Sequence, residues 1–240
     1  MRTAERRTKK VTRPARLRGG MAVRIAGRLE IPEWVRDYES FRRWARSPEC
    51  PEKARLAFYD GDLWVDPDME QFYAHNDVKA EFTAVLRPLV NAGKLGRYGT
   101  DGMLVSHSAV GLATTPDGFF FTFEALTADR IRPVSGARNG VVEFEGTPDM
   151  VLEVVSDSSE EKDLVDLPTL YWKGGIAEYW VVDARGEYVR FEILKRGPKA
   201  YNSTRKQTGG WVRSDVFGRS FRLVRGQDPV GKPVFTLEVK

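Results

Sequence analysis

Two acidic residues that lie far apart along the chain, Asp117 and Glu153, each stand beside or within a strand-like apolar segment. Asp117 precedes the aromatic run 118–123, and Glu153 lies in the middle of the apolar run 147–156. An unpaired carboxylate is costly in a strand that is covered on both faces. Contact with a metal ion, a cationic partner or a water-filled cleft would relieve that cost for Glu153. A structural salt bridge, or exposure to water on an edge strand, is the alternative for Glu153.

The spacing of these two acids is compatible with a shared site. They are 36 residues apart, and the connection between them is long enough for their strands to pair. Two carboxylates that converge from neighbouring strands can hold Mg²⁺, a hard ion that prefers oxygen ligands. A bound metal can generate hydroxide and stabilise charge on a phosphodiester, and a nearby lysine can add positive charge. The structural alternative for Asp117 is a local role in the turn 116–118.

Other chemistries find less support in the sequence. The single cysteine, Cys50, lies between two prolines, which disfavours a cysteine nucleophile and excludes a disulfide framework. With only two histidines, a zinc site is also disfavoured. A serine triad would need a nucleophile elbow, which the chain lacks. Glycoside hydrolysis by paired acids, and hydrolysis of another phosphate ester or of a nucleotide, stay open.

A long helix is expected over residues 69–92, because apolar residues recur there at helical spacing. Its inner stripe consists of Phe72, His75, Val78, Phe82, Val85, Leu86 and Leu89. Pro88 is expected to end or kink this helix. His75 on the stripe is more typical of a core histidine than of a ligand, and Glu81 lies off the stripe toward solvent. Both are second-tier candidates for the site.

The remaining elements surround this arrangement. Aromatic residues at helical spacing predict a helix over 31–45, and Asp60-Gly61 predicts a two-residue hairpin turn. A second helix is expected over 162–173, with a kink or restart at Pro168. The last strand-like segments are 178–183, its hairpin partner 188–195, and shorter pieces around 211–216, 220–224 and 235–239. Because no repeat or linker divides the chain, residues 21–240 are expected to form one domain.

The composition is that of a soluble globular protein. Hydrophobic residues make up 41% of the 240 residues and charged residues 30%. No apolar run approaches the roughly 20 residues of a membrane span, and the N-terminus lacks the apolar region of a secretory signal. We therefore expect no membrane association and a cytoplasmic location.

The charge is unevenly distributed. Residues 1–20 contain eight Lys or Arg against one Glu, whereas residues 21–240 contain 30 basic and 33 acidic residues. A basic tail of this kind can hold nucleic acid by counterion release. It is equally compatible with solvated disorder, or with translation that starts at Met21. Charge runs alone are weak evidence for function, so the two structural readings of the tail are favoured.

Several motifs follow one another in a characteristic order: His75-Asn76 at a helix start, Pro116-Asp117, the segment 148–156 (PDMVLEVVS), and Asp163, Tyr171 and the segment 175–183 (GIAEYWVVD). In this order of motifs the chain resembles the Uma2 family. The hairpin segment 58–64 (FYDGDLW) also fits. The resemblance covers roughly residues 55–195, and its longest motif, 148–183, is quite specific.

Uma2 proteins are restriction endonuclease-like members of the PD-(D/E)XK nuclease superfamily. The resemblance implies an α/β fold with an αβββαβ core and a mixed sheet, flanked by an N-terminal helix and hairpin and a β-rich C-terminal extension. It also implies that Asp117 and Glu153 bind Mg²⁺, with Mn²⁺ as a substitute ion. Asp149 shares the face of Glu153 by alternation, so it would be a further ligand or a structural acid. DNA is the implied substrate, and a homodimer is left open.

The chain departs from the superfamily pattern at the lysine. Val155 stands two residues after Glu153, where that lysine would share its face, and Leu167 stands where many Uma2 relatives carry a lysine. The nearest substitute is Lys162, in the first turn of the expected helix, where it opposes the helix dipole unless negative groups compensate. A solvated Lys162 is the alternative. Two functions therefore compete: a Mg²⁺-dependent DNA endonuclease, and a catalytically impaired DNA-binding or regulatory protein.

Overall fold

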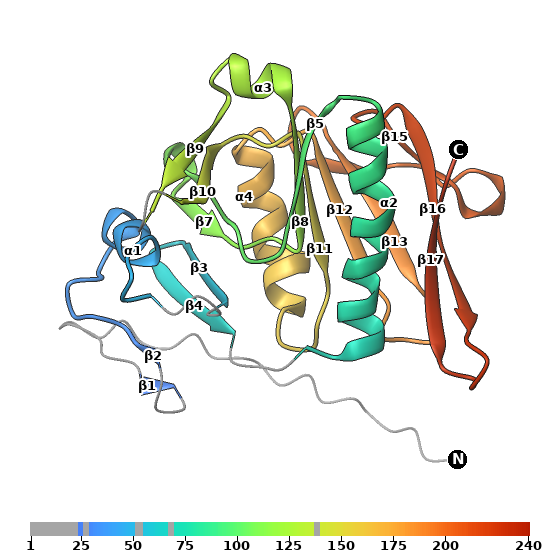
Figure 1. The fold of residues 1–240 in the computed structure, drawn as a ribbon, viewed down its shortest axis with the longest axis horizontal. Helices are drawn as coiled ribbons and strands as arrows, with labels where there is room; N and C mark the ends of the chain where they lie inside the picture. Colours follow the sequence, from blue (N-terminus) through green and yellow to red (C-terminus); the bar gives the residue numbers. More distant parts are fainter. Residues whose placement is uncertain (1–23, 26–28, 51–54, 67–69, 137–139) are drawn as a thin grey trace.

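A computed structural model of the chain describes residues 24–25, 29–50, 55–66, 70–136 and 140–240. The basic segment 1–20 lies outside the described residues. Within the described part the strands form four sheets, two of them with six strands each (Figure 1). Among the described helices, none combines the length and apolar character that a bilayer crossing requires.

The first six-stranded sheet carries the two candidate acids, and we call it the central sheet. Its strands are β5 (Gly96–Thr100), β8 (Gly118–Thr122), β11 (Met150–Val154), β12 (Glu178–Asp183), β13 (Arg190–Arg196) and β14 (Tyr201–Ser203). They lie in the order β14-β13-β12-β11-β8-β5. β11 and β12 are parallel, and the other neighbours are antiparallel. Helix α2 (Val78–Ala92) precedes β5, and α4 (Leu167–Lys173) connects β11 to β12, so the expected αβββαβ core is confirmed.

The second six-stranded sheet is assembled from segments inserted between the core strands and from the N-terminal hairpin. Its strands are β3 (Arg55–Tyr59), β4 (Asp62–Asp66), β6 (Leu104–His107), β7 (Leu112–Thr114), β9 (Ile131–Ser135) and β10 (Val141–Gly146). The hairpin turn is confirmed: Asp60 and Gly61 have φ angles of 52° and 81°, as a type I′ turn requires. The sequence predicted strands in some of these segments, but not that they form a sheet together.

Helix α1 (Tyr38–Ala45) packs beside the second sheet, and it is shorter than predicted. The Asp37 carboxylate accepts a hydrogen bond from the backbone N–H of Ser40, so the helix begins there and not at Pro32. Trp34, which was expected on the buried stripe, is 39% exposed. The smaller described helices are α3 (Phe123–Thr127), η2 (Ser108–Val110) and η5 (Thr208–Gly210).

The long predicted helix is present in two parts. A π-helical turn, η1 (Phe72–Asp77), leads into α2, which runs through Pro88 to Ala92 without ending. Buried Leu86 and Val90 on either side of Pro88 keep these last turns packed on the sheet. Phe72 is 61% exposed, so its predicted place on the inner stripe was wrong.

The C-terminal strands form a separate three-stranded sheet, named here the C-terminal sheet. It consists of β15 (Val212–Ser214), β16 (Arg219–Gln227) and β17 (Pro233–Val239), paired antiparallel. Figure 1 shows it beside α2, at the opposite end of the molecule from α1. The predicted β-rich C-terminal extension is therefore confirmed. A short pair, β1 (Arg24–Ile25) and β2 (Leu29–Glu30), precedes α1.

Both faces of the central sheet are covered by apolar side chains. One face packs against α2 and the C-terminal sheet, through residues such as Leu152, Trp180 and Phe82. The other face packs against α4 and the second sheet, through residues such as Val151 and Leu167. All five residues of β11 are buried, as expected for a strand covered on both sides. That residues 21–240 form one domain stays a prediction.

Candidate active site

Strand pairing brings Asp117 and Glu153 to the same end of the central sheet. β8 and β11 are antiparallel, and Leu152 is paired with Gly118. Asp117 and Glu153 are the next residues in this register, so they stand opposite each other on neighbouring strands. One Asp117 carboxylate oxygen, Oδ2, accepts a hydrogen bond from the backbone N–H of Val154, 2.8 Å away. The backbone of β11 thereby holds the first acid beside the second.

Glu153 lies on the α4 face of the sheet and is only 1% exposed. The Tyr171 hydroxyl donates a hydrogen bond to its Oε1 at 2.6 Å, and Lys162 Nζ lies 4.0 Å from its Oε2. Burial raises the pKa of Glu153 well above its ordinary value, and the negative charges of Asp163 and Asp117 raise it further, against the opposing charge of Lys162. Glu153 is thus a carboxylate whose charged form needs more positive charge than the protein supplies.

Asp117 has a different environment, because two side chains of the preceding helix reach it. His75 Nε2 lies 3.5 Å from Oδ2, and Lys79 Nζ lies 3.5 Å from Oδ1. Burial alone would raise the pKa of Asp117, but His75, Lys79 and the Val154 N–H together lower it. The pKa of Asp117 is therefore lowered and the pKa of Glu153 raised, and opposite shifts of this kind are common for paired carboxylates at functional sites.

A second π-helical turn, η4 (Lys162–Asp166), places a lysine and a third acid at the site. Lys162 Nζ lies 3.1 Å from Asp163 Oδ1, and the Ser159 hydroxyl donates a hydrogen bond to Oδ2 of Asp163. Glu153 and Asp163 raise the pKa of Lys162 despite its burial, so the ammonium stays charged. These carboxylates supply the negative charge that a cation in the first turn of a helix requires. π-Helical turns are frequent at functional sites, and here both carry pocket residues.

A pocket opens over these residues at the end of β8 and β11. The charged and titratable side chains that line it are those of Arg55, His75, Asp101, Asp117, Glu153, Lys162 and Asp163. They come from the β3–β4 hairpin, η1, the turn after β5, the two central strands and η4. Side chains far apart along the chain thus share one cavity.

A network of ion pairs surrounds Lys79, one of the two side chains that contact Asp117. Lys79 Nζ lies 2.7 Å from Asp101 Oδ2 and also forms an ion pair with Glu70, which in turn pairs with Arg55. Although burial opposes it, hydrogen bonds from Lys79 and Asn76 and the charges of Lys79 and Arg55 lower the pKa of Glu70 to about 2. Glu70 therefore stays ionised and fixes the position of Lys79.

Two of the sequence-derived candidates lie away from the pocket. Asp149 is at the opposite end of β11, where its carboxylate accepts hydrogen bonds from the backbone N–H of Thr122 at 2.7 Å and from Arg130 at 3.0 Å. Of the two roles expected for it, the structure places it as a structural acid and not with Asp117 and Glu153. Side-chain alternation correctly placed Asp149 on the same face as Glu153. The two residues are four positions apart, however, and four residues of strand span roughly 13 Å.

Glu81 also has a structural contact. Its carboxylate accepts a hydrogen bond from the backbone N–H of Leu237 in β17, at 2.7 Å. It was expected to be solvated, and instead it links α2 to the C-terminal sheet. His75, the other second-tier candidate, does line the pocket.

Sequence reasoning did not single out Lys79, Asp163 and Tyr171 as site residues. Lys79 follows His75 by four residues, a spacing that places both on one helix face, so this pair could have been found. Asp163 is next to Lys162 and was considered only as part of the family motif. Tyr171 was likewise considered only as part of the family motif, and its contact with Glu153 depends on how α4 packs on the sheet.

The oxygen donors at this site suit a hard divalent cation. Mg²⁺ is usually bound by one or two carboxylates and keeps several waters. Asp117 and Glu153 form such a pair, and Glu153 Oε2 is beyond hydrogen-bond distance from Lys162. In the described part of the chain, no group of three or more His, Cys, Asp or Glu side chains is arranged to hold a metal ion. Two carboxylates that line one pocket fit an ion that keeps most of its water ligands.

Comparisons with known proteins identify the family and the fold of the chain. A family model, Uma2, described as "Putative restriction endonuclease", matches residues 38–224. Among solved structures, the chain is similar to a protein from Anabaena variabilis described as "a putative nuclease belonging to DUF820". The TM-score is 0.55 at 16% sequence identity, covering 76% of this chain and 90% of that chain, which shows a shared fold. No curated protein matches the chain. From the match over residues 38–224, together with the nuclease-like fold, we conclude that the chain belongs to the Uma2 family.

Proposed function

We propose that the protein is a Mg²⁺-dependent endonuclease that hydrolyses phosphodiester bonds of DNA. The observation that carries the proposal is the position of Asp117 and Glu153, opposite each other on paired strands and in one pocket. The family is described as restriction endonuclease and the similar solved structure as a nuclease, and both descriptions support a hydrolase that acts on nucleic acid.

In this proposal Asp117 and Glu153 hold the metal ion, and Mn²⁺ would suit the same oxygen ligands. When bound, the ion would lower the pKa of a water molecule and offset negative charge on the phosphodiester. Tyr171 orients Glu153 through its hydrogen bond to Oε1, and the Val154 N–H orients Asp117. Asp163 holds the Lys162 ammonium at the pocket.

Lys162 takes the role of the missing motif lysine. The two alternative positions are buried: Val155 and Leu167 are both 0% exposed and belong to the core between the central sheet and α4. Lys162 lines the pocket and lies 4.0 Å from Glu153. From there its charge can favour a phosphate or an attacking hydroxide in the pocket.

The test is cleavage of supercoiled plasmid DNA with Mg²⁺, with EDTA as the metal-free control. The wild type should nick or linearise the plasmid, whereas Glu153→Gln and Asp117→Asn should not. Asp149→Asn is the matched control, because Asp149 is an acid next to the same strand but outside the pocket. Wild-type protein that leaves the plasmid intact, or equal cleavage by Glu153→Gln, would refute the proposal.

A second candidate function is a nuclease-fold protein that binds DNA or regulates without cutting it. It is favoured by Val155 and Leu167, which stand where the resemblance expects a lysine, and by the close pairing of Lys162 with Asp163. This protein would bind DNA without metal and with a steep dependence on salt, and would leave plasmid intact. Absence of DNA binding at low salt would remove this candidate.

Three further expectations stay part of the proposal. DNA is the proposed substrate, in keeping with the family description "Putative restriction endonuclease". A cytoplasmic location is consistent with a chain that has a single cysteine. A homodimer would allow cleavage of both strands, and size-exclusion chromatography with light scattering measures it directly.

A further inference from the structure

The charge of the chain beyond its N-terminal tail is divided between two regions of opposite sign. Residues 196–240 contain ten Lys or Arg and three Asp or Glu, a balance of +7. Residues 21–195 contain 20 basic and 30 acidic residues, a balance of −10. The small net charge of residues 21–240 therefore hides a strongly basic C-terminal region.

Basic side chains in the two regions also differ in their partners. In the first region many form ion pairs, such as Arg42 with Glu143 and Arg185 with Asp183. In the C-terminal region, several basic side chains are exposed and have no ion pair among the described residues. These are Lys199, Arg205, Lys206, Arg213, Arg219 and Lys232. Unpaired surface cations attract an anionic partner without first breaking internal contacts.

The C-terminal sheet directs its charges to one face. Alternate residues, including Val212, Phe221 and Leu237, are buried against α2 and the central sheet. Residues adjacent to these in sequence, including Arg213 and Arg222, therefore point away from the core. The register aligns Arg213 with Ser220, and Ser220 exchanges both backbone hydrogen bonds with Lys240. The outer face of the sheet thus carries Arg213, Arg222 and Lys240, and the preceding loop carries Arg205 and Lys206.

An aromatic side chain lies among these cations. The Arg222 guanidinium lies 4.8 Å and the Lys240 ammonium 4.4 Å from the ring centroid of Trp211. Glu238 binds Arg222 from the neighbouring strand and holds it in place. An aromatic ring flanked by cations is a pattern that nucleic-acid-binding surfaces use for contacts with sugars, bases and phosphates.

We propose that this outer face binds the sugar–phosphate backbone of DNA, at a surface separate from the catalytic pocket. We define the surface as Arg205, Lys206, Trp211, Arg213, Arg222 and Lys240. No residue of 196–240 is among those that line the pocket. The proposal rests on the proposed function only in that the DNA bound here is the DNA to be cut. The face carries no sequence readout by itself, because phosphate contacts position a duplex without specifying its bases.

The experiment measures binding without cleavage. Full-length Glu153→Gln protein in EDTA is titrated against a fluorescein-labelled DNA duplex, and anisotropy is recorded at several NaCl concentrations. The test variant adds Arg205→Ala, Lys206→Ala and Arg213→Ala. For each phosphate contact removed, we expect the salt slope to fall by about 0.9 and the affinity to fall roughly fivefold to tenfold near 0.1 M salt.

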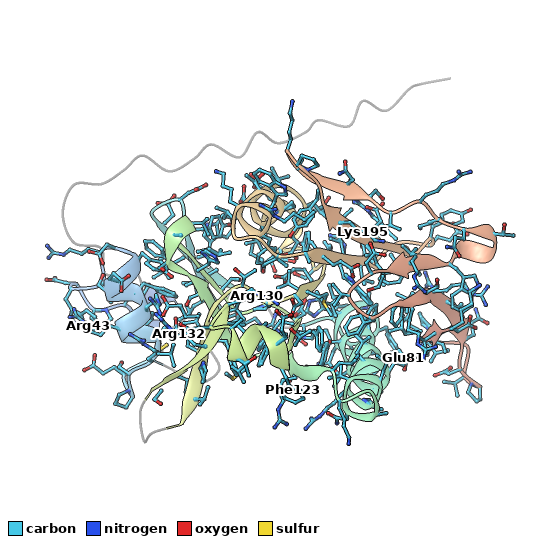
Figure 2. All side chains as sticks on the ribbon, turned by 90° about the horizontal axis from the view of Figure 1, so that it is seen from above. Arg43, Glu81, Phe123, Arg130, Arg132 and Lys195 are labelled. Carbon is cyan, nitrogen blue, oxygen red and sulfur yellow. The ribbon has the colours of Figure 1, made fainter. Side chains whose placement is uncertain are left out.

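A control variant of equal charge carries Arg36→Ala, Arg43→Ala and Arg87→Ala. These three arginines are exposed and lie outside the C-terminal region, and Arg43 is at the far end of the molecule (Figure 2). The affinity of this control variant for DNA should change by less than about twofold. Thermal unfolding midpoints equal to that of the parent show that both variants are folded. The basic segment 1–20 is present in every variant, so its contribution cancels.

Several outcomes would overturn the proposal. Equal losses in the test and control variants would show an effect of net charge alone, and an unchanged test variant would place DNA elsewhere. Competition by polyglutamate as effective as competition by unlabelled duplex would assign the face to an acidic protein. Plasmid cleavage by the wild type tests the proposed function separately. If the wild type cuts the plasmid but the test variant binds DNA as tightly as its parent, only the proposed binding surface is refuted.

Discussion

The backbone N–H of Val154 donates a 2.8 Å hydrogen bond to the carboxylate of Asp117 on the neighbouring strand. This bond joins the last residue of β11 to the residue that precedes β8, directly beside Glu153. The separation of the two acids is thus set by the pairing of two buried strands and not by flexible side chains. Preorganisation of this kind is what a metal site on rigid elements requires.

Replacing Glu153 by Gln is expected to lower the cleavage activity without lowering the stability of the protein. The change removes a proposed metal ligand and should lower plasmid cleavage at least about a hundredfold, since several kcal/mol of transition-state stabilisation are lost. Because burial raises the pKa of Glu153, its ionisation at neutral pH costs folding free energy, and the neutral amide avoids that cost. The free energy of unfolding in urea at pH 8 should be unchanged or higher. A large loss of stability would show that the charged form of Glu153 supports the fold.

Lys162 is expected to act on the reaction and not on substrate affinity. Lys162→Gln should lower the cleavage rate about 10²- to 10³-fold, the range seen when one stabilising donor is removed. DNA affinity in EDTA should stay close to that of the wild type. The control is Lys173→Gln, an exposed lysine in the last turn of α4. If Lys162→Gln cleaves as fast as the wild type, another cation serves the site, and Lys79 would be the next to test.

Asp149 is expected to contribute to stability and not to cleavage. Asp149→Asn weakens the hydrogen bond from the Thr122 N–H and the ion pair with Arg130, so it should lower the free energy of unfolding by about 1–2 kcal/mol. Its cleavage rate at a temperature well below unfolding should equal that of the wild type. Loss of cleavage with the stability intact would instead make Asp149 a metal ligand.

Asp183 is expected to make stability depend on acid pH. Hydrogen bonds from Arg185 lower the pKa of Asp183, against the opposing effect of burial. A lowered folded-state pKa means that the contribution is complete above pH 3.8, the ordinary value, and is lost as pH falls through the folded value. The stability difference between wild type and Asp183→Asn, from urea unfolding, should therefore be constant from pH 7 to about pH 5 and shrink below that. A difference that does not change with pH would show that Arg185 does not act through the charge of Asp183.

Much of the site was predictable from local features. The buried strand with a central acid, the acid that opens an aromatic strand, and the long connection between them led to Asp117 and Glu153 as partners. The turn at Asp60-Gly61 was predictable because backbone conformations with positive φ favour those residues. Lys162 was expected as the substitute lysine, and it does line the pocket.

Other parts depended on contacts that the sequence does not encode locally. The second sheet joins short strands from three separate stretches of the chain, so no single segment indicated it. Trp34 and Phe72 had helical spacing, yet both lie outside the core: Trp34 precedes the start of α1, and Phe72 is the first residue of the π-helical turn η1. A periodic pattern gives the face of an element but not where that element starts.

The sequence by itself determined which acids are candidates for the chemistry and on which face of a strand each one lies, because side-chain alternation is a local property of the backbone. Only the tertiary structure decided which of them meet. Asp149 and Glu153 share a face of β11, but strand rise separates them, whereas Asp117 reaches Glu153 through antiparallel register. His75, Lys79 and Asp163 join them because two helical segments pack on opposite faces of one sheet and begin at the same end of its strands.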